Sequence, residues 1–260
     1  MPRRSGRHCP FVDLICEAAG LAENRQLERD GKKTRQLHTS EFGEAVLHRD
    51  PYLEYPATWW FIHLNLARRS WSIWGWFFNE FRERSFDRAS CVEAYLRYLR
   101  LHAAKEPTTA VAQADIACLL LAYASRSGSQ RPDPEDGTSS PLRDLGLLVQ
   151  HEDTERFERT RPLDEVPLEC FLACVGAAGA DRGQEAISIS EMLSVSGGPG
   201  RIFGLTADGI EDMAIRSARQ FSGLGISLDL LGAEQCLRVR PEWTIKFWLN
   251  MHFDRIGAGV

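Results

Sequence analysis

Residues 49–66 read RDPYLEYPATWWFIHLNL and, beyond Arg68 and Arg69, residues 71–81 read WSIWGWFFNEF. Five of the chain's seven tryptophans lie in these two segments. A buried Trp or Phe removes roughly 150–250 Å² of surface from water, so no other part of the chain can contribute as much to a core. We therefore expect the fold to be organised around residues 49–81.

The same stretch predicts a tight helical hairpin. Pro56 suits the first position of a helix, where its missing N–H costs nothing. The residues from 57 to 68 are apolar on most sides, which is typical of a buried helix. A second helix then carries Trp71, Trp74 and Phe78 on one stripe, with polar groups at the ends of the hairpin.

Bulk composition limits the class of protein. The 260 residues suffice for one large domain or two ordinary ones. The net charge of −5 argues against a basic protein that coats nucleic acid, but it does not exclude a local basic patch. The seven cysteines are scattered without disulfide spacing, which indicates a reducing compartment. No apolar run reaches ~18 residues, so we expect no membrane span and a cytoplasmic protein.

Helical patterns and short hairpin patterns alternate along the chain, whereas a strand–helix–strand repeat is missing. The sequence thus predicts a mostly α (α+β) protein with two helical lobes, winged-helix-like β-hairpins and no doubly wound sheet. Residues 125–140 are rich in Ser, Gly, Pro and Asp, a linker composition. We predict an N-terminal helical domain over 1–126, a flexible linker over 127–140 and a C-terminal α+β domain with two small hairpins over 141–260.

A basic ribbon lies between the first predicted helix, over 11–22, and the next, which Thr39 or Ser40 caps. Helix, ribbon and LHTSEFGEAVL together resemble the second half of a winged helix, a module that binds DNA or pairs with proteins. Arginine suits phosphate contacts. The predicted DNA contacts are Arg25, Arg29, Lys32, Lys33 and Arg35 in the ribbon, and Arg68, Arg69, Arg143 and Arg201 elsewhere.

Common catalytic motifs are missing. The glycine-rich loop at 197–201 lacks the Gly-Lys-Ser/Thr ending of a phosphate loop, and it reads as a tight turn with no helix directly after it. Neither a Gly-x-Ser-x-Gly elbow nor a His-Glu-x-x-His helix occurs. The sequence therefore favours no nucleotide or organic cofactor.

Asp50, Glu54 and His63 are the remaining candidates for chemistry. Two carboxylates can hold Mg²⁺ or another divalent metal, and a histidine can activate water for attack on a phosphodiester. On this hypothesis Asp50 and Glu54 are the metal ligands and all three residues are catalytic. The structural alternative is that the carboxylates cap helix ends and that His63 is a core histidine with its hydrogen bonds satisfied.

The motifs at 47–63 and 71–81, with SPLRDLGL at 140–147 and GRIFGL at 200–205, resemble an uncharacterised-domain family encoded beside DNA phosphorothioation genes. The resemblance runs from about residue 12 to 253. Members usually carry a longer N-terminal region that completes the winged helix, so the resemblance implies that this chain begins inside that region.

The resemblance implies a protein that binds double-stranded DNA and nicks it, so that partners can place sulfur in the backbone. Those partners are a cysteine desulfurase, an ATP-pyrophosphatase-like sulfur-transfer enzyme and an ATPase, acting in antiphage defence. The alternative is a non-catalytic subunit that recognises DNA or serves as a scaffold for the sulfur-transfer machinery. Pairing of two copies of the chain is open in either case.

Overall fold

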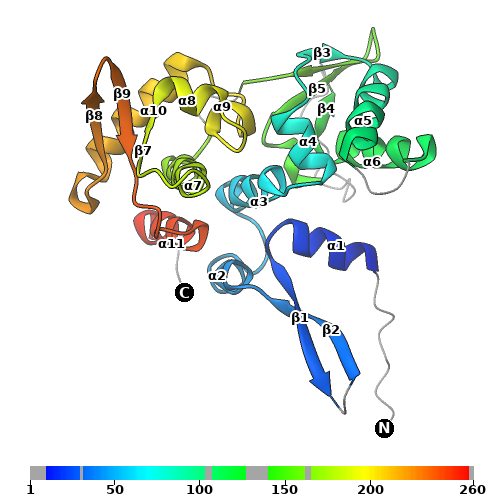
Figure 1. Cartoon of the computed structure of the whole chain (residues 1–260), viewed down its shortest axis with the longest axis horizontal. Helices are drawn as coiled ribbons and strands as arrows, with labels where there is room; N and C mark the ends of the chain where they lie inside the picture. Colours follow the sequence, from blue (N-terminus) through cyan, green and yellow to red (C-terminus); the bar gives the residue numbers. More distant parts are fainter. Residues whose placement is uncertain (1–9, 30–31, 103–106, 127–139, 162–164, 258–260) are drawn as a thin grey trace.

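The structure is a computed structural model that describes residues 10–29, 32–102, 107–126, 140–161 and 165–257. Helix α3 (Pro56–Arg68) is central: it packs against α4 (Ile73–Asn79), α7 (Leu168–Ala180), α9 (Pro199–Ile202) and α11 (Ile245–Ile256). Figure 1 shows α7 and α11 on one side of it and α4 on the other. Pro56 begins α3 and Trp60, Phe61 and Leu64 are fully or almost fully buried, as the sequence predicts.

The turn between α3 and α4 is tight because of two small residues. The Ser72 hydroxyl accepts a hydrogen bond from the Gly75 N–H, 2.9 Å away, and so caps α4. A Cβ on Gly75 would lie 2.2 Å from the carbonyl oxygen of Arg69, which only glycine avoids. The prediction that Trp71 lies on the apolar stripe of the second helix was wrong. Trp71 precedes α4 and is 70% exposed, because the turn takes it out of that stripe.

The helices pack against small sheets. In the four-stranded sheet the order is β3 (Ser85–Phe86), β6 (Arg156–Arg159), β5 (Leu148–His151) and β4 (Ala124–Arg126), with only β4 and β5 parallel. The three-stranded antiparallel sheet has the order β7 (Ala186–Ser188), β9 (Glu234–Arg238) and β8 (Ser227–Leu231). The mostly α, α+β class is confirmed, and no doubly wound sheet occurs among the described residues.

The remaining helices surround these elements. They are α1 (Pro10–Ala18), α2 (Glu41–Arg49), α5 (Arg88–His102), α6 (Thr109–Tyr123), η1 (Pro141–Arg143), α8 (Ile189–Ser194), α10 (Ala207–Gln220) and η2 (Ser222–Leu224). Ser40 caps α2, as predicted, and Thr206 caps α10. Ser188 caps α8, and α9 begins inside the glycine-rich loop at Pro199, where the sequence predicted a tight turn. No described helix has the length and apolar character needed to cross a membrane.

The linker predicted at 127–140 lies between two strands that pair with each other. Strand β4, before the predicted linker, pairs with β5, after it, and one contiguous core joins residues from Ala18 to Phe253. Most of the linker itself, residues 127–139, lies outside the described residues. Independent folding of 1–126 and 141–260 therefore stays a prediction.

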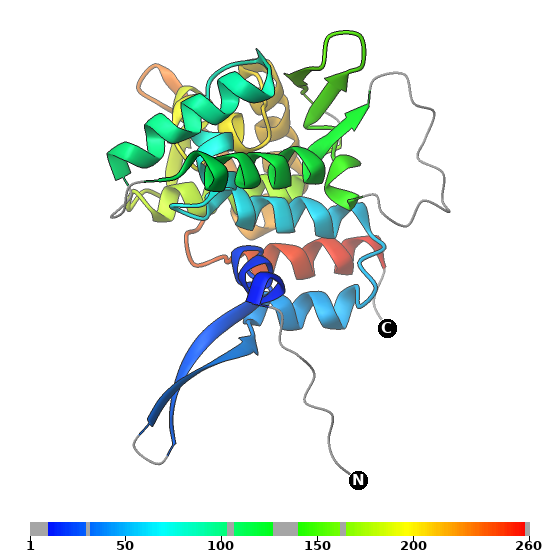
Figure 2. The ribbon, with the colours of Figure 1, turned by 90° about the vertical axis from the view of Figure 1, so that its right-hand side faces the viewer.

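A β-hairpin extends from the body of the molecule. Strands β1 (Ala22–Arg29) and β2 (Lys32–Thr39) pair antiparallel in unbroken register from Ala22–Thr39 to Arg29–Lys32. Figures 1 and 2 show this hairpin standing away from the helices, joined to them through α1 and α2. We call residues 22–39 the arm.

Candidate functional site

Asp50 shapes the loop before α3. It is 2% exposed, and its carboxylate accepts hydrogen bonds from the Glu54 N–H at 2.8 Å, the Tyr55 N–H at 3.2 Å and the Thr58 hydroxyl at 2.7 Å. Both oxygens are thus occupied by donors that fix the turn and the first residues of α3. This arrangement leaves Asp50 poorly suited to bind a metal.

His63 lies inside the core. It is fully buried; its Nε2 is 2.9 Å from the carbonyl oxygen of Ile202 and its Nδ1 is 2.9 Å from the Tyr123 hydroxyl. Because a carbonyl can only accept, Nε2 carries the proton and Nδ1 accepts from Tyr123. Burial lowers the pKa of His63 to about 4, despite the hydrogen bond to Ile202, so the ring is neutral.

The expected convergence of Asp50, Glu54 and His63 on an open groove is therefore wrong. The helix α3 is apolar on most sides, so the face that carries His63 turns into the core. Glu54 is exposed and instead lines a cavity of about 580 Å³, together with Trp59, Asp144 and Glu165. The described residues contain no group of three His, Cys, Asp or Glu placed to hold a metal. The geometry favours the structural alternative for Asp50 and His63, and catalysis by the three residues stays a prediction.

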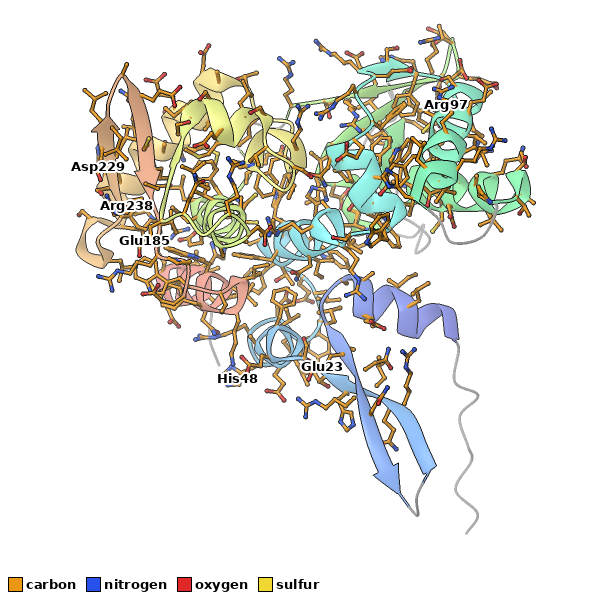
Figure 3. The ribbon with its side chains drawn as sticks, in the orientation of Figure 1. Glu23, His48, Arg97, Glu185, Asp229 and Arg238 are labelled. Atoms are coloured by element: carbon orange, nitrogen blue, oxygen red, sulfur yellow. The ribbon has the colours of Figure 1, made fainter. Side chains whose placement is uncertain are left out.

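The arm carries the predicted ribbon contacts. Arg25 and Arg35 are exposed, and Arg25 pairs with Glu23 across 2.6 Å. Figure 3 labels Glu23 at the base of the arm and shows side chains projecting from the ribbon around it. The backbone places Arg29, Lys32 and Lys33 near the tip of the arm, but their side chains lie outside the described part of the structure.

Arg68 serves to join segments that are far apart in sequence. Its guanidinium donates to the carbonyls of Gly197 at 3.0 Å and Ala177 at 3.2 Å, and it pairs with Asp181 at 2.6 Å. Its side chain is 16% exposed. These contacts hold α3 against α7 and the glycine-rich loop, so Arg68 has a structural role whether or not DNA approaches it.

The other three predicted arginines outside the arm also contact groups within the protein. The Arg69 side chain is 47% exposed and pairs with Glu17 across 2.7 Å. Arg143 donates to the Leu121 carbonyl at 2.9 Å, and Arg201 donates to the Ser194 carbonyl at 3.2 Å. Arg143 thereby joins η1 to α6 and Arg201 joins α9 to the end of α8. DNA contact by any of the three stays a prediction.

The turn between α3 and α4 borders a second cavity, which the sequence did not reveal. Its volume is about 280 Å³, and it is lined by Arg68, Arg69, Trp71, Trp76, Asn79, Glu80, Tyr98, Asp181, Ser196 and Gly197, among others. The Asn79 side chain accepts a hydrogen bond from the Gly197 N–H at 2.6 Å, across 118 positions of sequence. The sequence offered only separate signals, the group Arg68, Arg69 and Trp71 and the glycine-rich loop at 197–201, and nothing in it indicated that the two meet.

Comparison with known proteins places the chain in a family. Residues 15–239 match the model of the family DUF4007, described as protein of unknown function, and the chain belongs to that family. The fold of this chain is that of SspB. A crystal structure of magnesium ion-bound SspB superposes with a TM-score of 0.81 at 21% identity, covering 94% of this chain and 74% of that one.

A second SspB crystal structure gives a TM-score of 0.77, again at 21% identity, covering 94% of this chain and 73% of the other. At this level of identity the likeness establishes the fold. No curated protein sequence matches the chain.

Proposed function

We propose that this protein binds double-stranded DNA through its arm, as a component of a DNA phosphorothioate modification system. The observation that carries the proposal is the arm itself, a two-stranded ribbon with eight residues in each strand that extends away from the folded body. The major groove of B-DNA is ≈ 12 Å wide and admits such a ribbon.

The charge of the arm supports this role. Residues 22–39 contain five Arg or Lys and three Asp or Glu, so the arm is net positive while the whole chain has a net charge of −5. A basic element on an acidic protein concentrates its attraction for phosphates at one place. Contacts to phosphates position a protein on the duplex without reading its sequence.

Membership of a phosphorothioate system is supported by the fold of SspB and by the motifs at 47–63, 71–81, 140–147 and 200–205. In that setting the partners would be a cysteine desulfurase, an ATP-pyrophosphatase-like sulfur-transfer subunit and an ATPase. Binding through the arm suits both roles that the resemblance implies, nicking the DNA or delivering the sulfur-transfer machinery to it.

Nicking of the DNA is a more specific claim than binding. SspB has been crystallised with magnesium, but in this chain the carboxylate of Asp50 is occupied by three donors and His63 is sealed in the core. We therefore derive no cleavage step through a metal at these residues. Relaxation of supercoiled plasmid in Mg²⁺, with chelator as control, measures the activity directly, and intact plasmid under both conditions would favour the delivery role.

A binding experiment with a matched control tests the role of the arm. The double variant Arg25→Glu/Arg35→Glu reverses two exposed charges on the arm. The control Arg97→Glu/Arg219→Glu changes the net charge equally on α5 and α10, and Figure 3 labels Arg97 at the opposite end of the molecule from the arm. Fluorescence anisotropy with a labelled duplex is measured at several salt concentrations.

We expect the arm variant to lose affinity for the duplex and to reduce the magnitude of the salt slope by about two, one for each lost phosphate contact. The control variant should keep the wild-type slope. Equal losses in the two variants would show that general charge, not the arm, attracts the DNA, and the proposal would then fail.

A further inference from the structure

The cavity beside the turn between α3 and α4 has the form of a small ligand site. Its volume of about 280 Å³ lies just below the usual range for small-molecule pockets, roughly 300–1,000 Å³, so it suits one nucleotide and excludes a duplex. Two aromatic side chains, Trp76 and Tyr98, line it with their rings 6.2 Å apart. These two rings pack against each other at 41°, so the ring that is free for a ligand to stack on is that of the exposed Trp71.

Trp71 lines this cavity with an unusual backbone conformation and a high exposure. Its φ is 61°, a left-handed conformation that is a genuine outlier for a bulky residue, and its side chain is 70% exposed. Its one described ring contact is with His102, at 5.4 Å between centroids. Backbone strain and an exposed indole together cost stability, and such costs cluster at functional sites.

The floor of the cavity is rigid. Gly197 donates its N–H to Asn79, and its carbonyl accepts from both Arg68 and the thiol of Cys174. A Cβ on Gly197 would lie 2.9 Å from Nη1 of Arg68, and the φ of +79° also favours glycine. The loop is therefore held against α3 and α7 by contacts that leave the cavity preformed.

The charges around the cavity select the kind of ligand. Glu80 and Asp181 line it, while the two arginines already face carboxylates, Arg68 with Asp181 and Arg69 with Glu17. A phosphate would meet these acids unfavourably. A nucleobase carries no charge, stacks on aromatic rings and presents N–H donors that carboxylates accept.

The cavity is also connected to the arm. Glu17, on α1, accepts from Arg69 at the cavity through one oxygen and from Asn24 of β1 through the other, at 2.7 and 2.5 Å. One side chain thus separates the base of the arm from the cavity. DNA lying along the arm would pass close to this opening.

We propose that this cavity receives the base of a single unpaired nucleotide of the bound DNA, stacked on Trp71 with its donors turned toward Glu80 and Asp181, while the phosphate stays outside the cavity. This inference rests on the proposed function, in which the arm binds the DNA that supplies the unpaired nucleotide. It adds a second contact, specific for a base that has left the helical stack.

The test uses the full chain and three labelled probes: a paired duplex, the same duplex with one unpaired nucleotide at its centre, and a short single strand of mixed sequence. The variant is Trp71→Gly, because glycine adopts the left-handed conformation readily and the fold should be retained. The control is Tyr52→Ala, which removes another exposed aromatic ring, 82% exposed, away from the cavity. Trp71→Phe tests rescue by a smaller aromatic ring.

We expect the wild type to bind the unpaired-nucleotide duplex about tenfold more tightly than the paired duplex, from a stacking gain of ≈ 1–3 kcal/mol per base. Trp71→Gly should abolish this preference and weaken single-strand binding, while its affinity for the paired duplex is unchanged. Trp71→Phe and Tyr52→Ala should keep the preference.

Two results would overturn the inference: equal wild-type affinity for both duplexes, or a preference that survives in Trp71→Gly. Failure of the arm is a separate result, because it appears as loss of paired-duplex binding. In that case the single-strand probe still decides the inference, since stacking at Trp71 does not require the arm.

Discussion

One carboxylate oxygen of Glu17 accepts a hydrogen bond from Nη2 of Arg69, 2.7 Å away, while its other oxygen accepts from Nδ2 of Asn24 at 2.5 Å. Glu17 thereby connects three elements: α1, the base of the arm and the turn between α3 and α4. The Glu17 side chain is 26% exposed and that of Arg69 is 47% exposed. Pairs this accessible to water contribute little to global stability, so the connection bears mainly on where the arm points.

Glu17→Ala should therefore loosen the arm without unfolding the protein. We expect the free energy of unfolding to change by less than about 1 kcal/mol. Amide hydrogen exchange over 22–29, measured by mass spectrometry, should become faster because the arm loses its tie to α1. Glu44→Ala, an exposed acid on α2, is the control and should leave exchange in the arm unchanged. Unaltered exchange in Glu17→Ala would show that strand pairing alone holds the arm.

The neutral state of His63 predicts a dependence of stability on pH. Burial lowers its pKa from 6.5 to about 4 in the folded protein, so between these values the unfolded chain binds a proton that the folded chain does not. Stability is then full above pH 6.5 and falls as the pH drops toward 4, by about 3 kcal/mol in all. Urea midpoints measured at several pH values test this.

His63→Gln is the informative variant, because glutamine can also donate to the Ile202 carbonyl and accept from Tyr123. It should be less stable than the wild type at neutral pH and show a flatter profile between pH 6.5 and 4. A profile as steep as that of the wild type would assign the dependence to other groups.

An ionic cluster around the buried Glu169, between α7 and α11, predicts a second loss of stability at lower pH. Glu169 is fully buried; burial alone raises its pKa, but hydrogen bonds from His252 and Arg255 outweigh burial and hold the pKa at about 2. The stabilisation is present above the ordinary value of 4.5 and is lost as the pH falls through 2.

Glu169→Gln should destabilise the fold by about 1.5–3 kcal/mol at neutral pH, because it removes the anion that accepts from the nearly buried His252 and the half-exposed Arg255. Asp212→Asn removes the exposed partner of Arg216 in α10 and should cost less than about 0.5 kcal/mol. Chemical denaturation of both variants gives the comparison. Similar small losses in the two would show that the cluster at Glu169 is no stronger than a surface pair.

Local signals in the sequence predicted many of the elements. Pro56 begins α3, Ser40 caps α2, and two small hairpins form in residues 141–260, one of them from β5 and β6. Each of these features depends on residues within one or two turns of each other, where propensity and capping act. The central place of the aromatic stretch followed from its large apolar area.

The candidate site depended on contacts that local signals do not encode. His63 meets Ile202 across 139 positions, and Gly197 meets Asn79 across 118. Proximity in sequence suggested that Asp50, Glu54 and His63 converge, but the helical rotation after Pro56 turns His63 inward while Glu54 stays outside. Trp71 was misplaced because its left-handed φ ends one helix pattern before the next begins, and no composition rule predicts that.

Gly75 is the residue that holds the turn between α3 and α4 closed, so its replacement should be costly. In Gly75→Ala the new Cβ would lie 2.2 Å from the carbonyl oxygen of Arg69, a backbone atom that cannot move without shifting the turn. Overpacking of this kind typically costs ~1–3 kcal/mol. Gly223→Ala is the matched control: its Cβ meets nothing within 4 Å and its φ is not positive, so stability should be unchanged or rise slightly. Urea denaturation should show a lower midpoint for Gly75→Ala at an unchanged m value.

Because the same turn positions Arg69 and Trp71, the Gly75→Ala variant should also weaken the binding of single-stranded DNA, whereas Gly223→Ala should bind it normally. Wild-type stability in Gly75→Ala would mean that the turn can open by about 1 Å, and the preformed cavity inferred beside it would lose its support.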